Sequence, residues 1–142
     1  MIELQQRKTA VKNFEVGPYV EYLGLELLDL SGDEVRARWD ATSRLHQTAG
    51  ILHGGVHCSV VETLASIGAG LWLGSKGRVV GVSNTTDFLR GVGDGQLTSI
   101  ARFVHRGRTQ QLWRVTTESQ DGRLVATGQV RLHNLLKTTE PV

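Results

Sequence analysis

The sequence has little cysteine, little proline and no long apolar run, and these shortages exclude several classes of protein. One cysteine, Cys58, among 142 residues excludes an internal disulfide and a cysteine-ligated zinc framework, and it fits a reducing compartment. The first residues lack the apolar core of a signal peptide, and no run approaches the roughly 20 apolar residues of a membrane span. We therefore expect a cytoplasmic protein without a membrane partner.

Charge and aromatic content are also modest. The net charge is +2 and aromatic residues make up 6% of the chain, with basic residues spread among acids. Neither value indicates a phosphate-tracking surface or a base-stacking platform, so nucleic acid is not an expected partner. A binding site for a single anionic ligand would explain this small excess of basic over acidic residues.

The length fits one domain with one core. We expect this domain over residues 17–135, because no linker divides the chain. Residues 1–16 are expected to form a flexible or loosely helical entry segment, and residues 136–142 a C-terminal tail.

One long helix and a series of strands are expected within the domain. Apolar residues at three- and four-residue spacing predict a helix through Leu73 that begins near Gly54, and a short helix is expected over Pro18–Leu23. A single sheet that curls round the long helix would give an α+β fold. The strands are expected at residues 25–30, 34–39, 78–89, 96–105, 109–119 and 124–133.

A glycine pair opens the predicted long helix, and one carboxylate lies within it. The helix start at Gly54 would present unpaired N–H groups and the positive end of the helix dipole, which could hold a carbonyl oxygen. Glu62 lies eight residues further on, roughly 12 Å along the axis, which is too far to serve the same helix start. The spacing therefore suggests a dimer in which Glu62 of one copy reaches the helix start of the other.

Two serines share the helix face of Glu62. Ser66 follows it by four residues and Ser59 precedes it by three, so either hydroxyl could orient the carboxylate or a water molecule. A partly buried Glu62 could then act as a base or a nucleophile.

The pattern around this helix resembles that of the hotdog-fold acyl-CoA thioesterases. The resemblance is strongest to the branch of the glutamate-type 4-hydroxybenzoyl-CoA thioesterase and the related enterobactin, menaquinone and phenylacetate pathway enzymes, and it extends from about Val16 to Leu135. The shared positions are a Gln, a Gly, a His-Gly-Gly run, a Glu and a Ser, here Gln47, Gly50, His53, Gly54, Gly55, Glu62 and Ser66.

The resemblance implies a hotdog fold and the hydrolysis of an acyl-CoA to free acid and coenzyme A, without a metal or redox cofactor. It implies that Glu62 is the nucleophile or base. Gln47, His53 and the Gly54 N–H of the opposite subunit would bind the thioester carbonyl, and Ser66 would position water or the attacking carboxylate. A dimer is the smallest assembly expected, and the family suggests a tetramer.

Further substrate contacts are expected at Gly55, Ser59 and Phe88. Phe88 stands where several relatives carry Asn or His near the acyl group, so it would make the pocket more apolar. An aryl or medium-chain acyl group is expected rather than a long chain. Guanidinium groups suit phosphate geometry. The resemblance therefore suggests three side chains near strand ends for the coenzyme phosphates, namely Arg90, Arg106 and Arg108.

Other interpretations of these residues stay open. His53 could be a structural histidine that hydrogen-bonds the backbone. His53 and His57 have the i, i+4 spacing of zinc ligands, but the run lacks the acid of the zinc-protease signature, so no metal site is expected. The same fold could instead form a non-hydrolytic acyl-CoA or aromatic-ligand binding module, or a hydratase or dehydratase.

Overall fold

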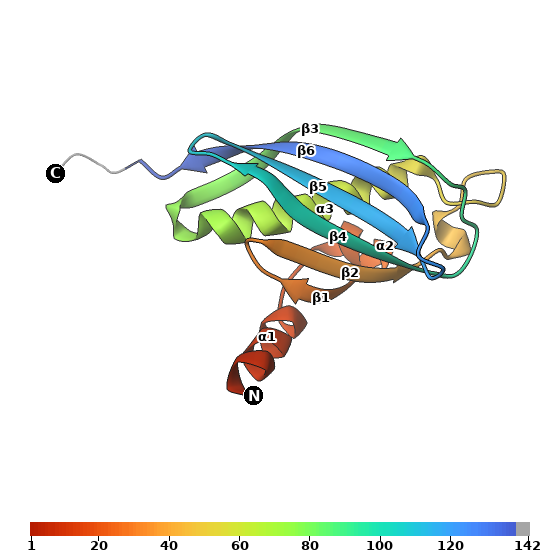
Figure 1. Ribbon diagram of the computed structural model, residues 1–142, viewed down its shortest axis with the longest axis horizontal. Helices are drawn as coiled ribbons and strands as arrows, with labels where there is room; N and C mark the ends of the chain where they lie inside the picture. The colour runs from red at the N-terminus through yellow and green to blue at the C-terminus, as the bar shows by residue number, and fades with distance from the viewer. Residues whose placement is uncertain (139–142) are drawn as a thin grey trace.

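A curved antiparallel sheet wraps around one long helix, as Figure 1 shows. The computed structural model describes residues 1–138, with their side chains except those of residues 7–10. Within this part of the chain, six strands form one sheet in the order β1-β2-β4-β5-β6-β3. Their bounds are β1 Glu26–Leu30, β2 Glu34–Asp40, β3 Gly77–Phe88, β4 Gln96–Arg106, β5 Gln110–Ser119 and β6 Leu124–Leu136.

The helices are α1 (Ile2–Lys12), α2 (Pro18–Leu23) and the central α3 (Gly54–Leu73), with 3-10 turns η1 (Ser43–Leu45) and η2 (Gly74–Lys76). The predicted α+β hotdog fold is confirmed, and the long helix, the short helix and the strands lie where the sequence patterns put them. The entry segment takes the helical form over α1, which projects from the body of the domain in Figure 1.

The last strand runs further than predicted. β6 continues to Leu136, whereas the pattern predicted a strand only to His133. Leu135 and Leu136 pair with Arg78 and Gly77 of β3, and this pairing extends the strand into the expected tail.

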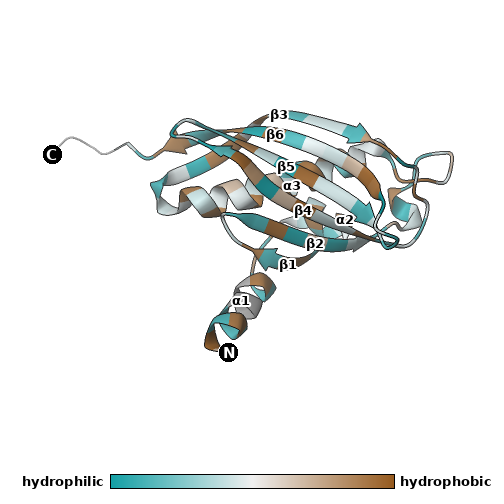
Figure 2. Ribbon diagram, viewed as in Figure 1, coloured by the Kyte–Doolittle hydropathy of each residue, from teal (hydrophilic) through white to brown (hydrophobic). Residues whose placement is uncertain are grey.

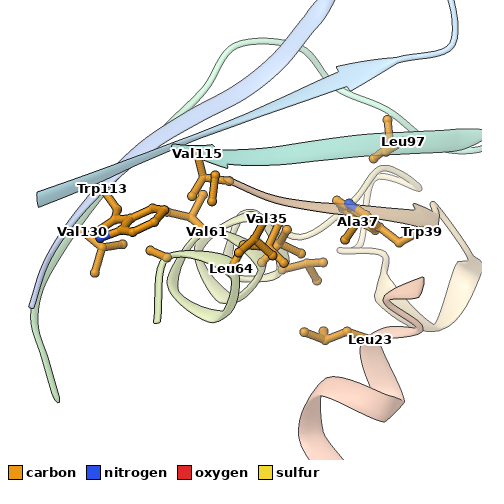
Figure 3. Close-up of a cluster of buried hydrophobic side chains, with 14 of the residues drawn as sticks. Leu23, Val35, Ala37, Trp39, Val61, Leu64, Leu97, Trp113, Val115 and Val130 are labelled. Atoms are coloured by element: carbon orange, nitrogen blue, oxygen red, sulfur yellow. The ribbon is translucent and has the colours of Figure 1, made fainter. Parts of the chain in front are cut away.

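Helix α3 packs closely on the sheet where small residues lie between them. A methyl group at Gly68 would lie 2.5 Å from the ring of Trp113 on β5, and a methyl group at Gly128 on β6 would lie 2.7 Å from Val61. Leu64 and Val61 are fully buried in the same layer, which Figure 3 shows between helix and strands. The core therefore consists of the inner face of the sheet packed directly on α3.

The two buried tryptophans satisfy their N–H groups inside this core, as buried indoles usually do. Trp39 Nε1 donates to Ser99 Oγ at 2.9 Å, and Trp113 Nε1 donates to Gln111 Oε1 at 2.8 Å. Gln111 Nε2 in turn donates to the carbonyl of Ala69 on α3, which ties the last turns of the helix to β5.

Segment Gly54–Lys76 would be long and apolar enough to cross a membrane by length and composition alone. This finding differs from the expectation that no run approaches that length. Half of its most apolar stretch is buried in the protein, which is the usual condition of the core helix of a folded domain.

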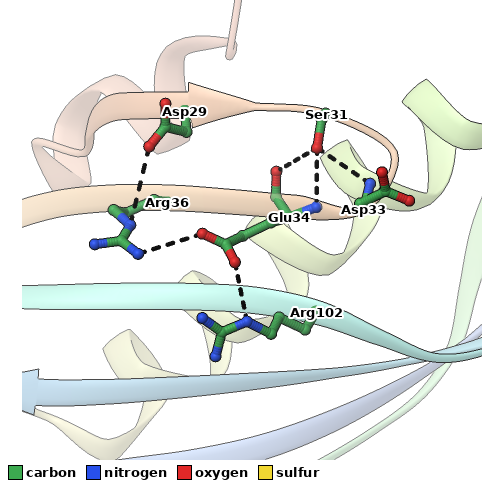
Figure 4. Close-up of polar contacts among 6 residues, drawn as sticks. All are labelled: Asp29, Ser31, Asp33, Glu34, Arg36 and Arg102. Carbon is green, nitrogen blue, oxygen red and sulfur yellow. Dashed lines mark hydrogen bonds and ion pairs between the residues drawn. The ribbon is translucent and has the colours of Figure 1, made fainter.

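Ion pairs link β1, β2 and β4, and hydrophilic and hydrophobic residues alternate along the strands in Figure 2. Glu34 on β2 accepts hydrogen bonds from Arg36 at 3.3 Å and from Arg102 on β4 at 2.9 Å (Figure 4). Partial burial would raise the pKa of Glu34, but the two guanidinium groups outweigh it and lower this pKa below its usual value.

The close packing of α3 can be tested at two glycines of the same helix. In Gly68→Ala the methyl group collides with Trp113, and overpacking of this kind costs about 1–3 kcal/mol, more than the gain of up to about 1 kcal/mol in helix propensity. Gly70→Ala is the matched control, since its methyl group would lie 3.9 Å from the nearest neighbour, Val79. Urea unfolding should show that Gly68→Ala loses stability while Gly70→Ala does not. Equal stability of the two variants would contradict the close contact.

Candidate active site

The start of α3 carries a backbone donor that is free to bind a ligand. His53 is the N-cap, and its Nδ1 accepts a hydrogen bond from the Gly55 N–H at 2.8 Å. Val56 N–H donates to the His53 carbonyl at 2.9 Å. Among residues 1–138, no group accepts a hydrogen bond from the Gly54 N–H. This donor therefore points out of the helix with the positive end of the dipole behind it.

The cap also fixes the imidazole of His53. Because Nδ1 accepts a hydrogen bond, the neutral ring must carry its proton on Nε2. His53 is exposed, so this Nε2–H is a second donor beside the Gly54 N–H. The structural role that the sequence left open for His53 is thus present, and it leaves a donor for a ligand.

Gly54 lies close to an aromatic neighbour. A side chain at this position would begin 2.5 Å from the ring of Phe88, at the end of β3. The Phe88 ring is half exposed and lies 6.0 Å from the ring of His57, which stacks edge-on to Trp39 at 5.8 Å. Phe88 therefore lies against the helix start and places an apolar ring there.

A tight loop before α3 holds Gln47. The Gln47 N–H donates to the Ile51 carbonyl at 2.8 Å, and Gly50 has a φ of 77°, the left-handed conformation that favours glycine. The side-chain oxygen of Gln47 accepts the N–H of Ala49, so the amide nitrogen is the group left to donate. His46 fixes the loop from outside, with Nε2 2.6 Å from the Gly93 carbonyl.

Glu62 lies on another part of α3, with a second group of residues. It is exposed in the single protomer, not partly buried as expected, and its Oε1 would lie 3.7 Å from a methyl group at Gly81 of β3. Glu62 and Ser66 both line a cavity of about 290 Å³. The remaining lining residues are Thr63, Ile67, Phe14, Glu15, Val16 and Val20.

Sequence reasoning missed the last four of these residues. Phe14, Glu15 and Val16 fall in the segment expected to be a flexible entry, and Val20 lies in α2. The sequence signal that could have shown them was the set of apolar residues on either side of Pro18. A short helix that begins at Pro18 can place such residues against a longer helix.

The two serines on the face of Glu62 have different surroundings. Ser59 Oγ donates to the Gly55 carbonyl at 2.8 Å and lies 2.6 Å from the hydroxyl of Tyr19, so it is not bonded to Glu62. Ser66 lines the same cavity as Glu62 and is the serine that shares the carboxylate's space.

The two groups of residues therefore lie apart within one protomer. The cavity at Glu62 is not lined by Gly54, His53 or Phe88, in keeping with the roughly 12 Å rise between residues 54 and 62 of a helix. Strand β3, beside Glu62, forms one edge of the sheet and exposes Val80 and Val82. An exposed apolar edge of this length is a surface on which another strand can pair.

The predicted phosphate-binding arginines do not lie together. Arg90 is near the helix start and pairs with Asp121 at 3.7 Å. Arg106 is at the other end of α3, where it donates to the Gly32 carbonyl and to Asp33 at 2.7 and 2.8 Å, and its guanidinium covers the Phe103 ring. Arg108 is exposed in the turn between β4 and β5.

A larger groove, of about 620 Å³, lies on the outer face of the sheet. Its lining includes Arg114, Gln129 and Arg131, and none of the residues predicted for the site. We place the candidate site at α3, because the hydrogen-bond donors at its start and the Glu62 carboxylate lie there, and none of them lines the larger groove.

Comparison with known proteins defines the class. The family model of the thioesterase superfamily matches residues 49–126, and the chain belongs to this superfamily. The crystal structure of AziG from S. sahachiroi is 57% identical, with a TM-score of 0.85 over 87% of this chain and 100% of that chain. The structure of Rv1847 from Mycobacterium tuberculosis is 45% identical, with a TM-score of 0.84 over 87% of this chain and 100% of that chain.

A relative that is named for its activity is also similar in sequence. The proofreading thioesterase EntH of Cronobacter turicensis is 32% identical over 121 residues, which cover 85% of this chain and 88% of that protein. The predicted family resemblance is thus confirmed.

His57 gives a test of the packing beneath the helix start. It is 3% exposed, and in the described part of the chain its Nδ1 has no hydrogen-bond partner, a condition that typically costs about 1–3 kcal/mol. Burial lowers the pKa of His57 below its ordinary value of 6.5. As the pH falls, the His57 ring is therefore protonated in the unfolded chain before it is protonated in the folded protein. The contribution of the neutral ring to the free energy of unfolding is fully present above pH 6.5 and declines as the pH falls below this value.

His57→Phe should remove this contribution, since the substituted ring cannot titrate and fits between Trp39 and Phe88. Urea unfolding at pH 7 and pH 5 should show a smaller acid-induced loss of stability than in the wild type. The control His105→Gln, at an exposed histidine, should keep the wild-type loss. An unchanged pH dependence in His57→Phe would show that the buried ring is not its source.

Proposed function

We propose that the protein hydrolyses an acyl-CoA, with an aryl or medium-chain acyl group, to free acid and coenzyme A. The observation that carries the proposal is the pair of half-sites on α3, with free donors at Gly54 and His53 and the Glu62 carboxylate in a cavity with an apolar wall. Membership of the thioesterase superfamily supports hydrolysis of a thioester. No metal or redox cofactor is needed for this chemistry.

We propose that the working unit is at least a dimer, joined at the β3 edge. Two β3 strands paired across a two-fold axis would cover Val80 and Val82. They would also bring both copies of Glu62 to the subunit interface, because Glu62 lies beside Gly81 of β3. Glu62 of one copy could then face the helix start of the other. This arrangement would also remove the exposure of the carboxylate.

In the proposed reaction, the thioester carbonyl oxygen accepts hydrogen bonds from the Gly54 N–H and from Nε2–H of His53. Glu62 of the partner copy then either attacks the carbonyl carbon or takes a proton from a water molecule that does so. Negative charge develops on the carbonyl oxygen, where the two donors and the helix dipole stabilise it. On the general-base route, the carbon–sulfur bond breaks, the proton held by Glu62 passes to the thiolate of the coenzyme, and the water oxygen remains in the free acid. On the nucleophilic route, the carbon–sulfur bond breaks to leave a mixed anhydride on Glu62, the thiolate takes a proton from solvent, and a water molecule then hydrolyses the anhydride to the free acid and the Glu62 carboxylate.

For the coenzyme phosphates, the three predicted arginines differ in availability. The guanidinium of Arg106 is held by Asp33 and the Gly32 carbonyl, and that of Arg90 by Asp121. Arg108 is exposed at a turn, with no ion pair in the described part of the chain, so we favour it for a phosphate. A cytoplasmic location would supply the substrate.

The key residue is tested by Glu62→Gln, which keeps the size of the side chain and removes the base or nucleophile. We expect kcat to fall by about 10²–10⁴-fold in an acyl-CoA hydrolysis panel that follows thiol release. Glu118→Gln is the matched control, because Glu118 is an exposed glutamate on β5 outside the Glu62 cavity. Full activity in Glu62→Gln would exclude the proposed mechanism. If the wild type cleaves no panel member but is stabilised against heat by CoA esters, it is a binding module.

The sharing of sites between copies has its own test. We propose that the Gln47 amide nitrogen also donates to the thioester carbonyl, beside Gly54 and His53. Glu62→Gln and Gln47→Ala should then each be nearly inactive alone, since one loses the base or nucleophile and the other a donor to the carbonyl. When the two variants are co-expressed, about a quarter of the wild-type activity should return, because half of randomly assorted dimers are mixed and each mixed dimer has one intact site. No recovery in verified mixed dimers would mean that each site is built from one chain.

A further inference from the structure

The segment from Phe14 to Val20 crosses the outer face of α3 beside Glu62. Phe14, Val16 and Val20 line the same cavity of about 290 Å³ as Glu62 and Ser66. None of the three belongs to the buried core, which includes Leu23 at the end of α2. These apolar side chains are therefore only partly covered, on the wall of a cavity that contains the proposed reactive carboxylate.

Local geometry holds this segment against the helix. Gly17 has a φ of 84° and turns the chain into α2, whose first residue is Pro18. The Tyr19 hydroxyl lies 2.6 Å from Ser59 Oγ. Since the Ser59 proton is donated to the Gly55 carbonyl, Tyr19 must be the donor in this contact. The segment is thus fixed to α3 at a point one turn from Glu62.

The two sides of the cavity differ in chemistry. Phe14, Val16 and Val20 on the segment, with Ile67 on α3, offer hydrocarbon, whereas Glu62 and Ser66 offer polar groups. An acyl thioester has the same division, with a polar carbonyl at one end and an apolar chain or ring at the other. The hydrocarbon wall would cover the acyl group when the carbonyl carbon lies at Glu62.

We propose that residues 14–20 form the wall that selects the acyl group, with Val16 and Val20 as specificity-determining residues and Tyr19 as the residue that positions the wall. This inference rests on the proposed function for the identity of the ligand. It assigns the choice of acyl group to the end of the expected entry segment, residues 1–16, together with the first residues of the domain.

The test uses coenzyme A thioethers, which cannot be hydrolysed and so report binding whether or not the protein is a hydrolase. Affinities of S-ethyl-CoA and S-octyl-CoA would be measured by calorimetry for the wild type, Val16→Phe and Val20→Phe. In Val16→Phe and Val20→Phe the larger side chain should fill the cavity and lower the affinity for S-octyl-CoA, relative to that for S-ethyl-CoA, by about tenfold or more. Val16→Ala should shift the ratio in the opposite direction. The control Val104→Phe, at an exposed valine of β4, should leave it unchanged.

Tyr19→Phe tests the positioning role separately. Loss of one hydrogen bond should weaken S-octyl-CoA by about threefold to tenfold with little effect on S-ethyl-CoA, because only the acyl wall is released. A general loss of folding would weaken both ligands equally.

The outcomes separate this inference from the proposed function. The proposed role of residues 14–20 would be overturned if the ratio of the S-octyl-CoA and S-ethyl-CoA affinities stayed unchanged in both phenylalanine variants, whether or not both affinities fell. It would also be overturned if the wild-type protein bound neither thioether. Chain-selective binding that follows the predicted ratios, combined with no acyl-CoA turnover, would support the wall and reject hydrolysis. Turnover with unchanged ratios would support hydrolysis and reject the wall.

Discussion

The close approach of α3 to the sheet is the constraint on which the other features depend. At Gly68 and Gly128 there is no room for a side chain between helix and strands, so the axial position of the helix is fixed by contact with Trp113 and by Val61. That position determines where the helix begins beneath Phe88, and it turns Glu62 and Ser66 away from the sheet toward the β3 edge and the N-terminal segment. The chemistry of the site is thus a result of how tightly the core is packed.

The fold could be predicted from the sequence because it depends on local patterns. The three- and four-residue spacing of apolar residues within α3 can be recognised from neighbours in the chain, and the helix that it predicted is present. The positions that match the family motif, such as His53 and Glu62, could also be identified. The distance between residues 54 and 62 along the helix also followed from helix geometry alone.

What could not be predicted depends on contacts between residues that are distant in sequence. Arg106 is occupied by Asp33, 73 residues away, and no local pattern shows that pairing. His57 lies between Trp39 and Phe88 on three different elements, so neither its burial nor its unpaired Nδ1 could be read from its helix. The lining of the Glu62 cavity was missed for the same reason, since Phe14 and Val16 meet residues of α3 that lie more than 45 positions further along the chain.

The hydroxyl of Ser59 contacts two functional regions at once. Through Tyr19 it touches the segment that borders the Glu62 cavity, and through the Gly55 carbonyl it touches the first turn of α3. In a dimer with shared sites, that first turn serves the neighbouring catalytic centre rather than its own. A ligand that displaces the segment in one centre would therefore pull on the oxyanion donors of the other, so the two centres would be mechanically coupled through a single side chain.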